Sequence, residues 1–326
     1  MRADLDRLMK EDNLDALWVM GAMKHNADMV YFTGVHEVNQ VDLFKRIGKA
    51  PVIYHFVNME REEAEKAGLE THSYDEEKPL DVYLKTHQNN VEQAVVHRLK
   101  DVMAEIGLGK GRIAVSGCTK VESALSLIDQ LRKLLPEVDF VFYPSNSPIL
   151  HARLTKEPDE AERIRRMAKL TVTVVDRVAK YLSSQDIVDN HLVNEHNQPI
   201  RIRDIKGLIN LWIAELGAEN PEETIFAIGR DAGIPHSNGN PNDLLELGKP
   251  IVFDIFPCEK GGGYFYDFTR TWCLGYADDE TTRLHQEVLM VYHTIINELK
   301  VNKPLKDYQI RTCQLFSEMG HQTVAD

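Results

Sequence analysis

The sequence predicts two domains: an α/β domain over residues 1–154 and a second domain over residues 155–326 that contains long helices and a β-hairpin. The chain has 326 residues, which is more than one hydrophobic core usually organises. In the first part, strand-like apolar runs alternate with helical patterns, which indicates an α/β domain with a largely parallel sheet. A connector with two prolines, residues 145–158, then separates this region from a long predicted helix.

The first domain is predicted from the alternation of two hydrophobic periods. The segment VEQAVVHRLKDVMAEIG repeats apolar residues at helical spacing, whereas RIAVSG and VDFVFYP are short apolar runs typical of strands. Gly68 is a candidate helix C-cap, and Pro136 ends a helix. The expected helices are residues 5–9, 26–35, 59–68, 91–107 and 121–135, and the expected strands are 14–21, 51–58, 112–117 and 138–144.

The second domain is predicted to begin with a helix at Pro158. Proline is favoured at the first helical position, and the acidic residues that follow it suit the helix dipole. This helix is expected to reach about residue 182, and further helices are expected at 202–218, 278–300 and 305–320. The residues of the 278–300 helix expected to face the core are Leu284, Val288, Val291 and Ile295.

Composition excludes several classes of function. The net charge is −13 without a basic block, which argues against nucleic acid as a partner. No apolar stretch reaches the roughly 18 residues of a membrane span. The charged N-terminus has no apolar signal core, and the four cysteines are scattered without metal-binding spacing. These features predict a cytoplasmic protein with free thiols and no membrane association.

The chemistry is expected in the segment 251–272, IVFDIFPCEKGGGYFYDFTRTW. Two runs of β-branched and aromatic residues flank a Gly/Pro-rich loop, which predicts a β-hairpin. Each run contains one acid, Asp254 or Asp267, and a lone carboxylate in an apolar strand is costly to bury unless it is paired or bound to a cation. If both acids face inward, they converge and favour a hard divalent cation between them.

Two further residues belong to this candidate site. His236 lies in GIPHSNGNPND, before the first strand, where it could donate to a substrate carbonyl or carry a proton. Thr269 is in phase with Asp267 along the second strand and could hydrogen-bond a ligand carboxylate. Structural roles are the alternatives. The two aspartates could be surface carboxylates paired with Arg270, and His236 could be a loop histidine that caps a turn.

The order GRDAGIPHSNG, GKPIVFDIFP, GGYFYDFTRTW resembles the first half of the catalytic domain of the Xaa-Pro aminopeptidase and prolidase family. The match runs through Asp254, Gly263-Tyr264, Asp267 and Thr269-Arg270-Thr271 in order. The resemblance implies that the second domain has the α+β pita-bread fold shared with methionine aminopeptidase and creatinase. It also implies that residues 1–154 form the family's N-terminal domain.

The resemblance further implies the activity and the site. The intact protein is expected to hydrolyse Xaa-Pro bonds in proline-containing peptides with two divalent metal ions, manganese first, with cobalt or zinc as alternatives. Asp254 would chelate one ion, Asp267 would bridge the two, and His236 would contact the substrate near the scissile bond. A homodimer is also expected from the family.

Two departures from the family pattern shape the expectation. The loop between the two aspartates is somewhat longer than usual, which a surface loop absorbs easily. The family's later ligands, a histidine in a Gly-His-Gly type segment and two glutamates, have no match after Asp267; His321 lacks the following glycine. We therefore expect a pita-bread domain that is incomplete in this chain, with weak metal binding and no turnover by the chain alone.

Two rival functions remain open from the sequence. The first is a non-catalytic binding or scaffold protein on the pita-bread fold, which the unmatched ligands favour and the paired acids disfavour. The second is a creatinase-like amidinohydrolase, which works without metal and has little reason to keep both aspartates.

Overall fold

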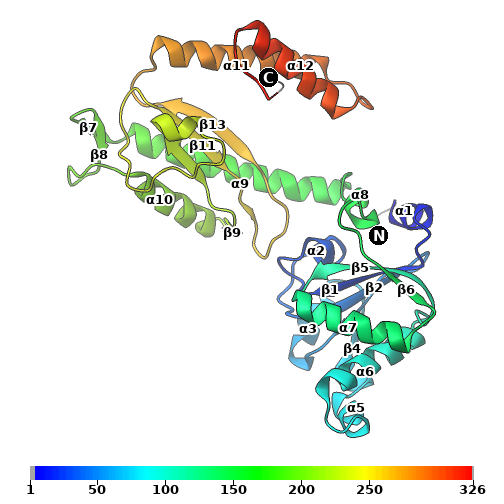
Figure 1. Ribbon diagram of the computed structural model, residues 1–326. Coiled ribbons are helices and arrows are strands. Elements are labelled where there is room, and N and C mark those ends of the chain that lie inside the picture. Colours follow the sequence, from blue (N-terminus) through cyan, green and yellow to red (C-terminus); the bar gives the residue numbers. More distant parts are fainter. Residues whose placement is uncertain (1–3, 325–326) are drawn as a thin grey trace. The chain divides into compact units, whose positions relative to one another are not determined.

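The structure is a computed structural model, and it describes residues 4–324. The described chain divides into two compact units (Figure 1). The first unit contains residues 4–175, 210–222 and 256–268, and the second contains the intervening segments and residues 269–324. The division therefore falls inside a long helix, α9 (Pro158–Ser183).

The first unit is built on a six-stranded sheet with the order β4-β3-β2-β1-β5-β6. Strands β1 and β5 are parallel, as are β5 and β6 and β3 and β4, whereas β2 runs antiparallel to both of its neighbours. The strands are β1 (Ala16–Gly21), β2 (Val41–Arg46), β3 (Val52–His55), β4 (Glu70–Ser73), β5 (Gly111–Cys118) and β6 (Val138–Val141).

Helices cover both faces of this sheet (Figure 1). Because side chains alternate along a strand, Trp18 and Met20 of β1 join one core and Leu17 and Val19 join the other. The helices of this region are α1 (Leu5–Glu11), α2 (Ala27–Thr33), α3 (Arg61–Glu65), α4 (Tyr74–Glu77), α5 (Leu80–Thr86), α6 (Val91–Glu105), α7 (Val121–Leu134) and α8 (Pro148–Ala152), with a 3-10 turn η1 (Asn58–Glu60). Helices α6 and α7 supply the core around Trp18, and α1, α2 and α8 supply the opposite one.

Strand β2 makes the sheet mixed, which corrects the expectation of a largely parallel sheet. The sequence did not indicate this strand, because the charged residues Asp42 and Lys45 interrupt its short run of apolar residues. Both are buried, and both are compensated. Asp42 accepts hydrogen bonds from Trp18 and Tyr74, and Lys45 donates to Asp6 of α1 and to its neighbour's carbonyl oxygen. Buried charges persist in a strand when such partners are present.

Two glycines let β1 and β5 approach closely near their carboxyl ends. Gly21 and Gly117 have φ values of +116° and +115°, which residues with a side chain rarely adopt. A Cβ at Gly117 would lie 2.1 Å from the carbonyl oxygen of Met20, and one at Gly21 would lie 2.2 Å from that of Cys118. Each strand therefore occupies the space where the other would place a side chain.

The second unit contains a three-stranded sheet of order β10-β11-β13 and a two-stranded hairpin. Strands β9 and β12 pair with each other in the first unit. The strands are β7 (Asp186–Val188), β8 (His191–Val193), β9 (Ala218–Glu219), β10 (Ile225–Ile228), β11 (Pro250–Ile255), β12 (Cys258–Glu259) and β13 (Phe268–Cys273). The remaining helices are α10 (Ile202–Glu215), α11 (Asp279–Glu298) and α12 (Leu305–Glu318), with a 3-10 turn η2 (Gly229–Gly233).

Helix α11 begins and ends near the predicted positions, but its expected buried stripe is wrong in part. Val291 is buried, whereas Leu284 and Val288 are 39% and 53% exposed. The helix packs against α12, and one partner helix covers only a narrow line along its surface. In the described part of the chain, no helix is both long and apolar enough to cross a membrane.

Candidate functional site

Asp254 lies near the end of β11, in the middle strand of the three-stranded sheet. Ile251, Phe253 and Ile255 are buried, and the residues between them are half-buried. Strand alternation therefore puts Asp254 on the face opposite to Phe253. Its Cα partner on the neighbouring strand β10 is Ile225.

Thr269 of β13 contacts Asp254 directly. The Thr269 hydroxyl donates a hydrogen bond of 2.6 Å to Oδ1 of Asp254. A hydrogen bond to one carboxylate oxygen restricts the rotation of the carboxylate and leaves the second oxygen available for another partner. Arg270, the alternative ion-pair partner in the sequence, donates to the backbone oxygen of Thr269 at 2.7 Å.

Asp267 is an exposed residue directly before β13, and it belongs to the segment 256–268 of the first unit. It precedes Thr269 by two positions and lies just outside the second strand of the hairpin, in which the sequence predicted it. The strands β11 and β13 of that hairpin are neighbours, as the sequence predicts. The loop between them is more ordered than expected, because it contains β12, which pairs with β9.

His236 is exposed and lies on a turn after η2, with φ of +61°. Two contacts fix the course of this loop. Gly239 lies against the backbone of β10, where a Cβ would meet the carbonyl oxygen of Phe226 at 2.3 Å. Asn238 donates to Glu223 at 3.3 Å, and Glu223 lies just before Ile225, the Cα partner of Asp254. The loop that carries His236 therefore returns toward the end of the sheet where Asp254 lies.

The hairpin loop is fixed within the first unit by a cluster that the sequence did not indicate. Arg163 of α9 donates to both carboxylate oxygens of Glu259, at 2.6 Å to Oε2 and 3.1 Å to Oε1. The same carboxylate accepts from the backbone N–H of Tyr264 at 3.0 Å, and the Tyr264 hydroxyl donates to Glu160. Burial raises the pKa of Glu259, but Arg163 and the Tyr264 amide outweigh burial and hold that pKa below its usual value. The sequence feature that could have indicated this cluster is a glutamate in a loop with three glycines.

The donor chemistry of the candidate residues fits a hard divalent cation, because carboxylate oxygens are the preferred ligands of such ions. Asp254 and Asp267 would supply these ligands. Among residues 4–324, no group of three or more His, Cys, Asp or Glu side chains is placed to hold a metal ion. A two-metal site requires more ligands than these two candidate aspartates.

Comparisons with known proteins agree on the family. The model of metallopeptidase family M24 matches residues 162–325. Uncharacterized peptidases of Staphylococcus aureus, for example those of strains MRSA252 and MSSA476, are 26% identical over 174 residues. These matches cover 53% of this chain and 45% of each relative, so the chain matches less than half the length of these curated relatives.

Solved structures resemble almost the whole chain. The X-Pro aminopeptidase from Thermotoga maritima is similar over 97% of this chain and 78% of its own, with a TM-score of 0.73 and 18% identity. The Xaa-Pro dipeptidase from Bacillus anthracis is similar over 97% of this chain and 77% of its own, with a TM-score of 0.69 and 14% identity. At these identities the likeness concerns the fold, and it confirms the predicted combination of an α/β domain and a pita-bread domain.

Proposed function

Because this chain belongs to metallopeptidase family M24, we propose that the whole protein hydrolyses Xaa-Pro peptide bonds with the help of divalent metal ions. The observation that carries the proposal is the Asp254–Thr269 pair on neighbouring strands, with Asp267 two positions before Thr269. The names of two structural neighbours, an X-Pro aminopeptidase and an Xaa-Pro dipeptidase, support the choice of substrate.

In this proposal the two aspartates hold the metal ions, and manganese is the expected metal. Divalent ions in such a site supply an activated water and polarise the substrate carbonyl. Thr269 keeps one oxygen of Asp254 in a hydrogen bond, so that the carboxylate has a fixed orientation when it binds its ligand. His236, on the loop that returns along β10, donates to the substrate carbonyl or carries a proton.

The test of the proposed function is peptide cleavage by the whole protein loaded with Mn²⁺. At least one of Ala-Pro and Ala-Pro-Ala should be cleaved, and matched peptides with alanine in place of proline should not. Comparison of the dipeptide with the tripeptide separates a prolidase from an aminopeptidase. Cleavage of Ala-Ala and not of Ala-Pro would refute the substrate class.

Site variants test the assigned roles. Asp254→Asn and Asp267→Asn should reduce cleavage of Ala-Pro to the background rate, because an amide is a weaker ligand for a hard cation. Asp186→Asn, at an exposed aspartate of β7, is the matched control and should leave the rate unchanged. Full activity in Asp267→Asn would refute its role as a metal ligand.

The role of His236 requires a substitution that keeps the turn. Asparagine tolerates positive φ, so His236→Asn preserves the backbone at +61°. This variant should bind Mn²⁺ like the unchanged protein but cleave Ala-Pro at least about 100-fold more slowly. Equal loss of metal binding and cleavage would contradict a role toward the substrate.

A further inference from the structure

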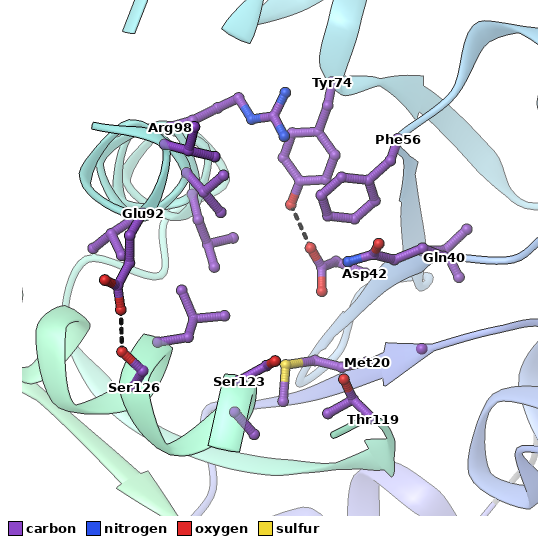
Figure 2. A pocket seen from close by; sticks show the side chains of 18 residues that line it. Met20, Gln40, Asp42, Phe56, Tyr74, Glu92, Arg98, Thr119, Ser123 and Ser126 are labelled. Atoms are coloured by element: carbon purple, nitrogen blue, oxygen red, sulfur yellow. Dashed lines mark hydrogen bonds between the residues drawn. The ribbon is translucent and has the colours of Figure 1, made fainter. Parts of the chain in front are cut away.

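A cavity of about 430 Å³ lies in the first unit, and neither hairpin acid is among its lining residues (Figure 2). Its lining includes Met20 and Gly21 at the end of β1 and Thr119 just after β5, together with Gln40 and Asp42 at the start of β2. Strands β1 and β5 are parallel, and the chain leaves them in opposite directions, toward β2 and toward β6. Open α/β sheets bind ligands at the carboxyl ends of their strands where the connections diverge in this way.

The cavity combines an apolar wall with a few polar groups. Helices α6 and α7 contribute the apolar part, which includes Val91, Val95, Leu99 and Leu127. A cavity of a few hundred Å³ with mostly apolar walls and a few polar groups is typical of a small-molecule site.

Arg98 is the polar side chain that indicates what this cavity binds. It lines the cavity and is only 3% exposed. Its guanidinium lies 4.8 Å from the centre of the Tyr74 ring and 5.5 Å from that of Phe56, and it is 3.6 Å from Asp75. Among the described residues it donates no hydrogen bond to a side chain or carbonyl. A guanidinium has five N–H donors, and the one contact with Asp75 leaves several of them available to a ligand.

The acids of the cavity have their partners within the fold. Asp42 accepts from Trp18 at 2.8 Å and from Tyr74 at 2.7 Å, so each of its two oxygens is already used. Glu92 accepts from Ser126 (Figure 2) and, at 2.7 Å, from Gln130. Arg98, in contrast, has only the longer ion pair with Asp75, at 3.6 Å, and is the strong donor of the cavity with unused hydrogen-bonding capacity.

We propose that this cavity binds a small molecule with a carboxylate head and an apolar body. The carboxylate accepts hydrogen bonds from Arg98, because the planar guanidinium matches two carboxylate oxygens. The apolar body lies against the side chains of α6 and α7. Asp42 and Glu92 also line the cavity, and these two acids favour a singly charged carboxylate over a doubly charged phosphate. This proposal does not depend on the proposed peptidase activity.

The test uses three probes that share one apolar body and differ in their head group. The first is 4-phenylbutanoate, the second is 4-phenylbutylamine, and the third is 2-amino-4-phenylbutanoate, which carries both groups. Isothermal titration should show 4-phenylbutanoate binding with a dissociation constant of about 1 mM or lower, and the amine should not bind. Binding of the third probe identifies amino acids as the ligand source, and its failure to bind identifies simple carboxylic acids. Absence of carboxylate binding, or equal binding of the amine, would overturn the proposal.

Two variants connect the binding to this cavity. Arg98→Met keeps an unbranched side chain against Phe56 and Tyr74, and it should weaken 4-phenylbutanoate binding at least about tenfold. Ser123→Trp, at an exposed lining position of α7, should block the cavity without removing any core contact. The control is Leu125→Trp on the same helix, because Leu125 is 65% exposed and does not line the cavity. Unchanged binding in Ser123→Trp would contradict the proposal even if Arg98→Met fails to fold.

Discussion

The Thr269 hydroxyl donates a hydrogen bond of 2.6 Å to Oδ1 of Asp254, from β13 to its neighbour β11. This contact joins the two predicted runs of the hairpin through one of its two acids. Two explanations of Asp254 agree with this contact: a carboxylate oriented for a ligand, and a surface carboxylate in the sheet.

Substitution of Thr269 tests the first explanation. Thr269→Val keeps the β-branched shape but removes the hydroxyl, so Mn²⁺ affinity should fall about tenfold. Thr269→Ser keeps the hydroxyl and should restore the affinity. The measurement is a Mn²⁺ titration followed by water-proton relaxation, with thermal unfolding of each variant as a check on folding. Equal Mn²⁺ affinity in the valine and serine variants would leave Thr269 with a structural role only.

The Arg163–Glu259 pair should contribute to the stability of the first unit. Both side chains are 21% exposed, and the two hydrogen bonds to one carboxylate make this a strong geometry. Arg163→Met should lower the free energy of unfolding by about 2 kcal/mol in urea titrations, because it removes the hydrogen-bonded cation of a partly buried carboxylate and leaves only the longer ion pair with Arg166, at 4.0 Å. Arg165→Met removes an exposed pair with Glu162 on the same helix and should cost less than about 0.5 kcal/mol. Equal losses in the two variants would contradict this assignment.

Asp42 should make the stability of the first unit depend on pH. Burial raises its pKa to about 6, against the opposing effect of the hydrogen bonds from Tyr74 and Trp18 and of the nearby Arg98 charge. The folded protein therefore keeps a proton on Asp42 between about pH 4 and pH 6, where the unfolded chain has lost it. From this group alone, stability is greatest near pH 4 and falls as the pH rises toward 6.

The matched variant for this effect is Asp42→Asn, which cannot titrate. The unfolding free energy of the wild type minus that of the variant should be larger at pH 4 than at pH 7, by up to about 3 kcal/mol. Urea unfolding of both proteins at several pH values measures the difference. A constant difference from pH 4 to pH 7 would show that Asp42 is already ionised throughout this range.

Gly117 should tolerate no side chain. Alanine there would place a Cβ 2.1 Å from the carbonyl oxygen of Met20 at a φ of +115°, so Gly117→Ala should cost about 3 kcal/mol or more. Gly207 lies within α10 with open space around its Cα, and Gly207→Ala should stabilise by about 0.5–1 kcal/mol. Thermal unfolding should therefore move in opposite directions for the two variants. A neutral Gly117→Ala would show that β1 and β5 can separate at little cost.

Local signals predicted most helices of the fold. Asn90 caps α6 through a hydrogen bond to the N–H of Gln93, and Pro158 begins α9, so both helices start where the sequence indicates. Strand β2 was missed, because the partners that make its Asp42 and Lys45 tolerable in the core come from distant segments. The local sequence shows that a residue is charged, but it does not show which distant residue will pair with it in the fold.

The candidate site shows the same limit. Strand phase pointed to Thr269 as a partner for a ligand carboxylate, and the structure places its hydroxyl on Asp254. The Arg163–Glu259 pair joins residues 96 positions apart, and no local period relates them. The cavity beside Arg98 was also missed. In the sequence, an arginine on the buried face of a helix looks the same as one on the solvent-exposed face.

The buried amine of Lys45 has a consequence for the chemical reactivity of the protein. Its side chain is fully covered, and its nitrogen donates to Asp6 and to the carbonyl oxygen of Arg46. Acylating reagents require a free and accessible amine, so Lys45 should be modified last among the lysines of the folded chain. Modification of Lys45 would therefore indicate that α1 has separated from β2.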